Sequence, residues 1–215
     1  QWYIHMDNIS LNGFDLEIVT NTLVPFNKKK MHGAYYFVLP HESEYKIRLT
    51  NDNDVRCDAI VYVDGDKIGT WRINEHGRIT IERPANKARK FTLLKTKSHE
   101  GIMSGMRSGK FENGLVKIIF RPEKIQERCE DCVYTNSQEQ YLGKSGTNFQ
   151  RECNQSYSAP MSASFMSSSM TRSGGMSEAG TGLGRASRQR FNRTSPLQDI
   201  DHENITTINA RLVVE

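Results

Sequence analysis

The sequence predicts an all-β protein: an antiparallel β-sandwich or jelly-roll-like domain followed by a long irregular tail rich in Ser, Met and Gly. Short runs of alternating apolar and polar residues recur from residue 14 to residue 120, with turn residues between them about every eight to twelve positions. Apolar residues then become sparse from about residue 124 to residue 196. No convincing amphipathic helix interrupts the strand-like runs, so the helical crossovers of a parallel sheet have no place in this sequence.

The first expected strands lie before residue 55. Residues 14–19 alternate apolar and acidic side chains, which is typical of a half-buried strand. Residues 34–39 form a short aromatic and aliphatic run that ends at Pro40. Residues 45–50 alternate again and stop at the turn sequence Asn-Asp-Asn-Asp of residues 51–54.

The middle of the chain contains the clearest β-hairpin. Residues 56–63 and 67–73 form its strands, and Asp64-Gly65-Asp66 forms the tight turn, in which Gly65 supplies a positive φ. Further strands are expected at residues 78–82, 89–95 and 115–120, bounded by His76-Gly77, Pro84, Asn113-Gly114 and Pro122.

A long connection precedes the last of these strands. Residues 96–112 contain three Gly and two Met, and connections of this length in small domains are usually functional or mobile. We expect a contact loop in which Met103 and Met106 bind a partner as adaptable apolar side chains. The alternative is that both side chains cover the end of the sandwich.

By composition the chain divides into a β-sandwich domain over residues 1–124, a low-complexity extended tail over residues 125–200 and a terminal strand-like segment over residues 201–215. Within the tail, residues 156–177 bury too little apolar surface to offset an ordering entropy of about 1–2 kcal/mol per residue. The Gly-rich residues 180–184 follow no strand and are interpreted as flexible chain.

The tail nevertheless carries large apolar side chains that a simple linker would not need. We expect five of them to dock onto a partner: Met161, Phe165, Met166, Met170 and Met176. Residues 206–214 alternate as a strand, and we expect them to add an edge strand to the domain's own sheet or to that of a neighbour.

Charge is a weak guide to function. The chain carries 29 Lys and Arg against 25 Asp and Glu, a formal net charge of +4. Basic runs occur at Lys28-Lys29-Lys30, at Lys87-Ala88-Arg89-Lys90 and at Arg185, Arg188, Arg190 and Arg193. Such runs can meet phosphate, but a solvated face is the commoner role, so we do not expect nucleic acid as a partner. Arg188 and Arg190 are expected to contact a protein partner.

The cysteines leave their chemistry open. Cys57 lies in a strand and is expected to be a buried or half-buried thiol. Cys129, Cys132 and Cys153 have half the spacing of a zinc site, and the nearest candidate for a fourth ligand, His202, is far along the chain. A disulfide within the trio is an equal alternative, and free thiols are favoured over both. We therefore expect no metal and no cofactor.

No catalytic motif is present in the sequence. It lacks a dinucleotide-binding or phosphate-binding glycine loop, a zinc-protease helix motif and a nucleophile elbow. The paired carboxylates at Asp52/Asp54 and Asp64/Asp66 lie in expected turns, where Asp bonds its own backbone, and fall short of a calcium loop. Trp71 is expected to pack in the core rather than stack on a ligand. We expect no catalytic residues and no enzyme; a hydrolase would need a nucleophile and base assembled from scattered positions.

A family resemblance is carried by four stretches of the chain: EYKIRLTNDNDVRCDAIVYVDGDKIGTWRI, ITIERPANKARKFTLL, ENGLVKIIFRPEK and the final TTINARLVV. They resemble a group of uncharacterised proteins of large eukaryotic DNA viruses and virus-like mobile elements, in which a strand-rich domain precedes a variable polar tail. The resemblance covers less than half of the chain and carries no functional residues. It implies a virion-associated structural role, such as that of a minor capsid protein.

These observations favour a structural assembly protein of a virion or similar large particle, in which the tail docks on neighbouring subunits. Its partners would be other protein subunits, so we expect an oligomeric protein located in the virion. No stretch approaches the ~20 apolar residues of a membrane helix. The alternative is a recognition or adhesion module that binds carbohydrate or a cell-surface protein through its loops.

Overall fold

The computed structural model describes residues 8–125 and 175–215 of the 215-residue chain. Both ranges belong to one unit. The strands are β1 (Ile9–Leu11), β2 (Phe14–Val19), β3 (Lys28–Met31), β4 (Ala34–Leu39), β5 (Lys46–Asn51), β6 (Cys57–Val63), β7 (Asp66–Ile73), β8 (Gly77–Ile81), β9 (Arg89–Lys95), β10 (Leu115–Pro122), β11 (Ser177–Ala186) and β12 (Thr206–Val214); the helices are α1 (His99–Met103) and the 3-10 helix η1 (His202–Asn204). The prediction of a mostly β chain is confirmed.

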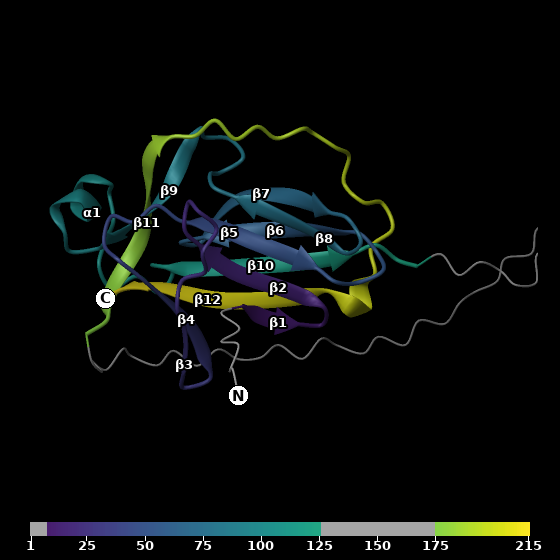
Figure 1. Ribbon diagram of the computed structural model, residues 1–215, viewed down its shortest axis with the longest axis horizontal. Helices are drawn as coiled ribbons and strands as arrows, with labels where there is room; N and C mark the ends of the chain where they lie inside the picture. The colour runs from purple at the N-terminus through teal and green to yellow at the C-terminus, as the bar shows by residue number, and fades with distance from the viewer. Residues whose placement is uncertain (1–7, 126–174) are drawn as a thin grey trace, which may run out of the picture. The chain divides into compact units, whose positions relative to one another are not determined.

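The strands form two sheets (Figure 1). The smaller has the order β1-β2-β5-β8 and is antiparallel throughout. The larger has the order β3-β4-β12-β10-β6-β7, and β11 and β9 extend it from β12. All its pairs are antiparallel except β4 with β12, which run parallel. The larger sheet is therefore mixed rather than purely antiparallel.

One hydrophobic core lies between the sheets. The Phe14 ring of β2 stacks on the Phe120 ring of β10, with 4.4 Å between their centroids, so the core joins the two sheets directly. Along β10 every second residue, Val116, Ile118 and Phe120, is buried in this core, as the alternation in the sequence predicts. Burial of these side chains is the main favourable free energy of folding.

Most of the expected strands form within one or two residues of their expected bounds, because each carries the period-two pattern of a half-buried strand. The β6–β7 hairpin turns through Asp64 and Gly65, with φ values of 52° and 87°, which is the pair of positive φ angles that a tight hairpin requires. Trp71 packs against the core, as predicted. The strands β1 and β3 and the helix α1 were not predicted.

The last strand, β12, is not at an edge, and the prediction of an edge strand is wrong. It lies between β4 and β10 of the chain's own sheet, pairing with β10 over residues 206–211 and with β4 over residues 211–214. The sequence shows that this segment is a strand, but its neighbours come from distant parts of the chain. The C-terminal strand is thus a central element of the domain.

The Gly-rich segment predicted to be flexible is strand β11. It pairs with β9 from Ala179, opposite Lys95, to Ala186, opposite Arg89. Glycine at position 184 leaves room for a β9 side chain, because a Cβ there would lie 2.1 Å from the Thr92 Oγ1 atom. The part of the predicted 125–200 tail that the structure describes, residues 175–200, therefore belongs to the β-domain.

After β11, residues 187–200 form a strap over the domain. The Gln189 side chain donates to the Thr80 carbonyl at 2.7 Å and accepts from the Glu82 amide at 3.0 Å. Phe191 packs edge-on against Trp71, with 5.5 Å between the ring centroids. Farther along, the Leu197 amide donates to Asp58 at 2.9 Å. The strap is fixed by polar and aromatic contacts. The small number of apolar residues in this segment therefore did not predict that it packs on the domain.

Among the described residues, no helix is long and apolar enough to span a membrane. Cys57 is a buried free thiol, as predicted, and burial raises its pKa to about 12. Cys129, Cys132 and Cys153, for which zinc, a disulfide or free thiols were considered, lie outside the described residues.

Candidate functional site

Polar residues gather where the β4–β5 loop meets β9 and β11, and they form an open groove of about 450 Å³. Its lining comprises Asn21, Glu42, Glu44, Thr92, Leu94, Gly184 and Arg185. The backbone of Glu44 bridges to Thr92 of β9, so the loop is fixed to the strand beside it. We call this hollow the Glu44 groove.

Glu44 is the best-satisfied charge of the groove. The Arg185 guanidinium donates two hydrogen bonds to its carboxylate, at 2.7 and 2.8 Å, and Asn21 donates a third at 2.8 Å. The ammonium of Lys90 lies 3.6 Å away. The Arg185 hydrogen bond is the main reason that the pKa of Glu44 falls to about 2, against the opposing effect of burial. Glu44 is therefore ionised at neutral pH and does not serve as a proton donor.

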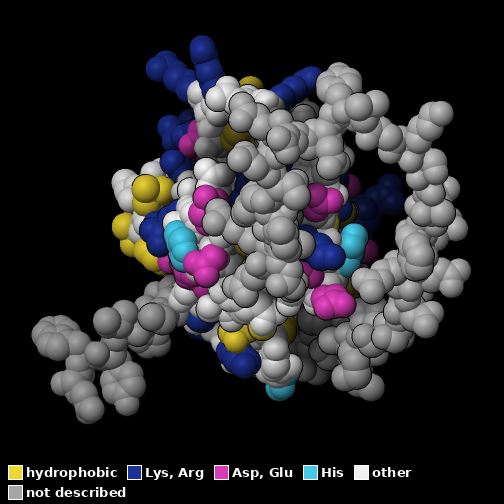
Figure 2. Space-filling view, turned by 90° about the vertical axis from the view of Figure 1, so that its right-hand side faces the viewer, with side chains coloured by type: hydrophobic (Ala, Val, Ile, Leu, Met, Phe, Trp, Pro, Cys, Tyr) yellow, Lys and Arg dark blue, Asp and Glu magenta, His cyan; other side chains and the backbone are white. Residues whose placement is uncertain are grey.

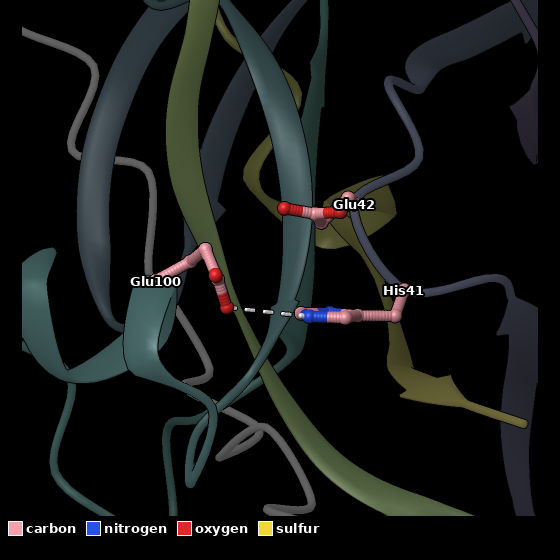
Figure 3. A group of neighbouring side chains, drawn as sticks. All are labelled: His41, Glu42 and Glu100. Carbon is pink, nitrogen blue, oxygen red and sulfur yellow. Dashed lines mark ion pairs between the residues drawn. The ribbon is translucent and has the colours of Figure 1, made fainter.

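His41, Glu42 and Glu100 form a second group beside this groove, with ligand atoms within 4.8 Å of one another (Figure 3). His41 and Glu100 point toward each other, with 3.6 Å between the His41 Nε2 and Glu100 Oε2 atoms. The Lys95 amide donates to His41 Nδ1 at 3.1 Å, so Nδ1 acts as an acceptor. A metal on Nε2 would require the proton on Nδ1 and would break that bond. The group thus has metal-binding distances but serves to fix the β4–β5 loop to β9 and α1.

Glu178 of β11 organises the long connection that was expected to contact a partner. Its carboxylate accepts from the Ser108 hydroxyl at 2.7 Å, the Asn113 amide at 2.8 Å and the Gly109 backbone at 2.9 Å. Burial raises the pKa of Glu178, but these hydrogen bonds outweigh it and hold the pKa below its ordinary value. The connection is an ordered loop with one helical turn at α1.

Asp64, interpreted from the sequence as a turn residue, also supports β11. Its carboxylate accepts from the Thr181 amide at 2.5 Å and from the Gly114 amide at 2.7 Å. Burial nevertheless raises the pKa of Asp64 to about 6, against the effect of these two bonds. The neighbouring Tyr45 hydroxyl lies 2.6 Å from the Thr181 hydroxyl.

Two basic runs that are far apart in the sequence lie side by side in the fold. Pairing of Ala186 with Arg89, and a 2.9 Å hydrogen bond from the Ser187 amide to the Ala88 carbonyl, place the 87–90 run next to the 185–193 run. We call the exposed cations of these runs that are not paired with Glu44 the basic ridge: Lys87, Arg89, Arg188, Arg190 and Arg193. Figure 2 shows Lys and Arg side chains gathered at the upper edge, the height at which β9 and the strap lie in Figure 1. Below that edge, basic, acidic and His side chains are intermixed.

Most of the ridge has no acidic partner in the part of the chain that the structure describes. Its neighbours Arg185 and Lys90 are paired with Glu44. Arg89 donates to the Gly184 carbonyl at 2.8 Å. No ion pair within residues 8–125 and 175–215 involves the remaining four cations: Lys87, Arg188, Arg190 and Arg193.

The residues predicted to bind a partner divide into separate groups. Met103 is 74% exposed at the end of α1, whereas the half-buried Met106 places its sulfur against Gly180 and so covers β11. Met176 is half-buried just before β11. Arg188 and Arg190 are exposed beyond the other end of β11, a ten-residue strand that spans about 33 Å. Met161, Phe165, Met166 and Met170 lie outside the described residues.

No protein-family model, curated protein or solved structure matches this chain. The virion-associated role implied by the sequence resemblance therefore remains a proposal.

Proposed function

We propose that this protein is a non-enzymatic assembly protein, in which a rigid two-sheet domain carries residues 126–174 as a docking segment for neighbouring subunits. One observation carries the proposal. On either side of that segment the chain is built into the sheets: β10 pairs with β6 and β12, and β11 pairs with β9 and β12. The segment is thus tethered at both ends rather than at one.

Tethering at both ends favours docking for a physical reason. A segment with both ends fixed loses less conformational entropy when it binds than a free tail of the same length. The apolar side chains Met161, Phe165, Met166 and Met170 supply the area to bury, and many copies in one particle would multiply weak contacts. A virion fits this design, because many copies of one subunit lie side by side in it, and the sequence resemblance is the reason for naming a virion.

The polar groups of the domain also favour binding over catalysis. The carboxylates of Glu44 and Glu178 are each held by several donors, and that of Asp64 lies under β11. Each stabilises a junction between segments that are distant in sequence. This is the use expected of a scaffold.

The test replaces Met161, Phe165, Met166 and Met170 with Ser in the full chain. Sedimentation velocity over a concentration series should show that the native chain associates and that the variant stays monomeric. The melting temperature should be unchanged, because the proposal gives these four side chains a role in docking and none in the two sheets. The matched control replaces Ser167, Ser168 and Ser169 with Ala and should associate like the native chain. A native chain that is monomeric at all concentrations, or a variant that associates equally, would contradict the proposal.

A recognition module is the second candidate, and the Glu44 groove is the observation that favours it. It is an open hollow, and its Glu, Asn, Thr and Arg side chains suit a polar ligand such as a carbohydrate. On this reading Glu44→Gln abolishes binding on a glycan array, while the four-residue Ser variant binds normally. The assembly role predicts that the four-residue Ser variant loses self-association and that Glu44→Gln keeps it.

A further inference from the structure

We propose that the basic ridge binds the phosphate backbone of nucleic acid. The sequence contains its two halves as separate short runs, and each alone is most simply a solvated face. The β9–β11 pairing joins them into one exposed row of cations. This inference is independent of the assembly role, because the ridge is complete within a single chain.

The backbone of the strap sets the spacing of the cations. Ser187, Gln189 and Phe191 are half-buried, and Gln189 and Phe191 contact the domain through Thr80 and Trp71. The alternate residues Arg188 and Arg190 are exposed. In extended chain, residues two apart are separated by about 6.6 Å, so Arg188 and Arg190 form a short outward row. A linear polyanion meets such a row with successive charges.

Contacts with the domain fix the backbone that carries the ridge. The Arg83 side chain donates to the Gln189 carbonyl at 2.9 Å, and its guanidinium lies 4.4 Å from the centroid of the Phe191 ring. On the other side, Arg89 donates to the Gly184 carbonyl at 2.8 Å. The backbone positions of the ridge are therefore set before a ligand arrives, and binding orders only the outer side chains.

The chemistry of the ridge suits the phosphates of nucleic acid. Four of its five cations are Arg, whose planar guanidinium can bind two phosphate oxygens at once. The four cations without an acidic partner retain their full charge for a ligand. The net charge of +4 adds a favourable long-range field. Phosphate contacts carry no base information, so we expect binding that is independent of sequence and sensitive to salt.

The test measures fluorescence anisotropy of a labelled 20-nucleotide single strand, its duplex and a labelled polyglutamate with the full chain at several salt concentrations. The test variant is Arg188→Gln with Arg190→Gln, two exposed side chains whose loss should leave the melting temperature unchanged. The matched control is Lys29→Gln with Lys30→Gln, which removes the same charge from the exposed strand β3.

We expect the ridge variant to bind nucleic acid at least tenfold more weakly at low salt. The slope of log affinity against log salt should decrease by about 1.4 to 1.8, the contribution of two phosphate contacts. The control should change affinity by less than threefold. The inference is overturned if the native chain binds neither nucleic acid, if polyglutamate binds as tightly, or if the control loses as much affinity as the ridge variant.

Discussion

At the scale of single residues, several charged side chains join parts of the chain that are distant in sequence. Glu44 and Arg185 are separated by 141 positions, and Glu178 and Asn113 by 65. The local sequence around these residues does not predict such pairs. The sequence interpretation of Asp64 as a turn residue was correct for its backbone but could not reveal that its carboxylate supports β11.

Asp64 makes a prediction about pH. Its pKa is about 6 in the folded domain against an ordinary value of 3.8, so folding favours the protonated form. The stabilising contribution is therefore complete below pH 3.8 and is lost as pH rises through about 6. The expected loss in the free energy of unfolding is up to about 3 kcal/mol between pH 4 and pH 7.

The variant Asp64→Asn cannot ionise, so its stability relative to the native chain should rise by up to that amount over the same pH range. Urea unfolding at pH 4.5, 6.0 and 7.5 measures the difference. Asp52→Asn, an exposed Asp in a different turn, is the control and should follow the native profile. If the free energy of unfolding changes equally with pH in the native chain and in Asp64→Asn, the raised pKa of Asp64 is wrong.

At the scale of elements, the sequence predicts strands well when they carry a clear alternation and poorly when they do not. The strands β2, β5, β6 and β10 alternate and were predicted. The strand β3 reads Lys-Lys-Lys-Met, because it lies at the edge of its sheet and Lys blunts such edges. The strand β11 was missed because Gly has low strand propensity, although close packing on β9 requires it.

Gly184 tests that explanation. In Gly184→Ala the new Cβ meets the Thr92 hydroxyl, so we expect a loss of about 1–3 kcal/mol in the free energy of unfolding. Hydrogen exchange at the β9 amides should also become faster, because the β9–β11 pairing weakens. Ala186→Ser, at the exposed end of the same strand, should unfold at the native urea concentration. If Gly184→Ala unfolds at the native urea concentration, the Thr92 side chain does not require glycine at position 184.

At the scale of the whole molecule, the division of the chain differs from the division that composition suggests. Composition indicates a domain followed by a tail, but the chain returns to the domain at β11 and finishes in the middle of the larger sheet at β12. The position of β12 depends on β4 and β10, so no local pattern could reveal it. Residues 126–174, the proposed docking segment, are therefore flanked on both sides by strands of the same domain.

The most direct test of this account excises that segment from the folded protein. Protease sites inserted after residue 126 and before residue 172 would release it, and sedimentation velocity of the product would follow. We predict that the two remaining fragments sediment together as one folded monomer, at concentrations where the intact chain associates. Fragments that separate would contradict the closed domain, and a joined pair that still associates like the intact chain would contradict the docking role of the segment.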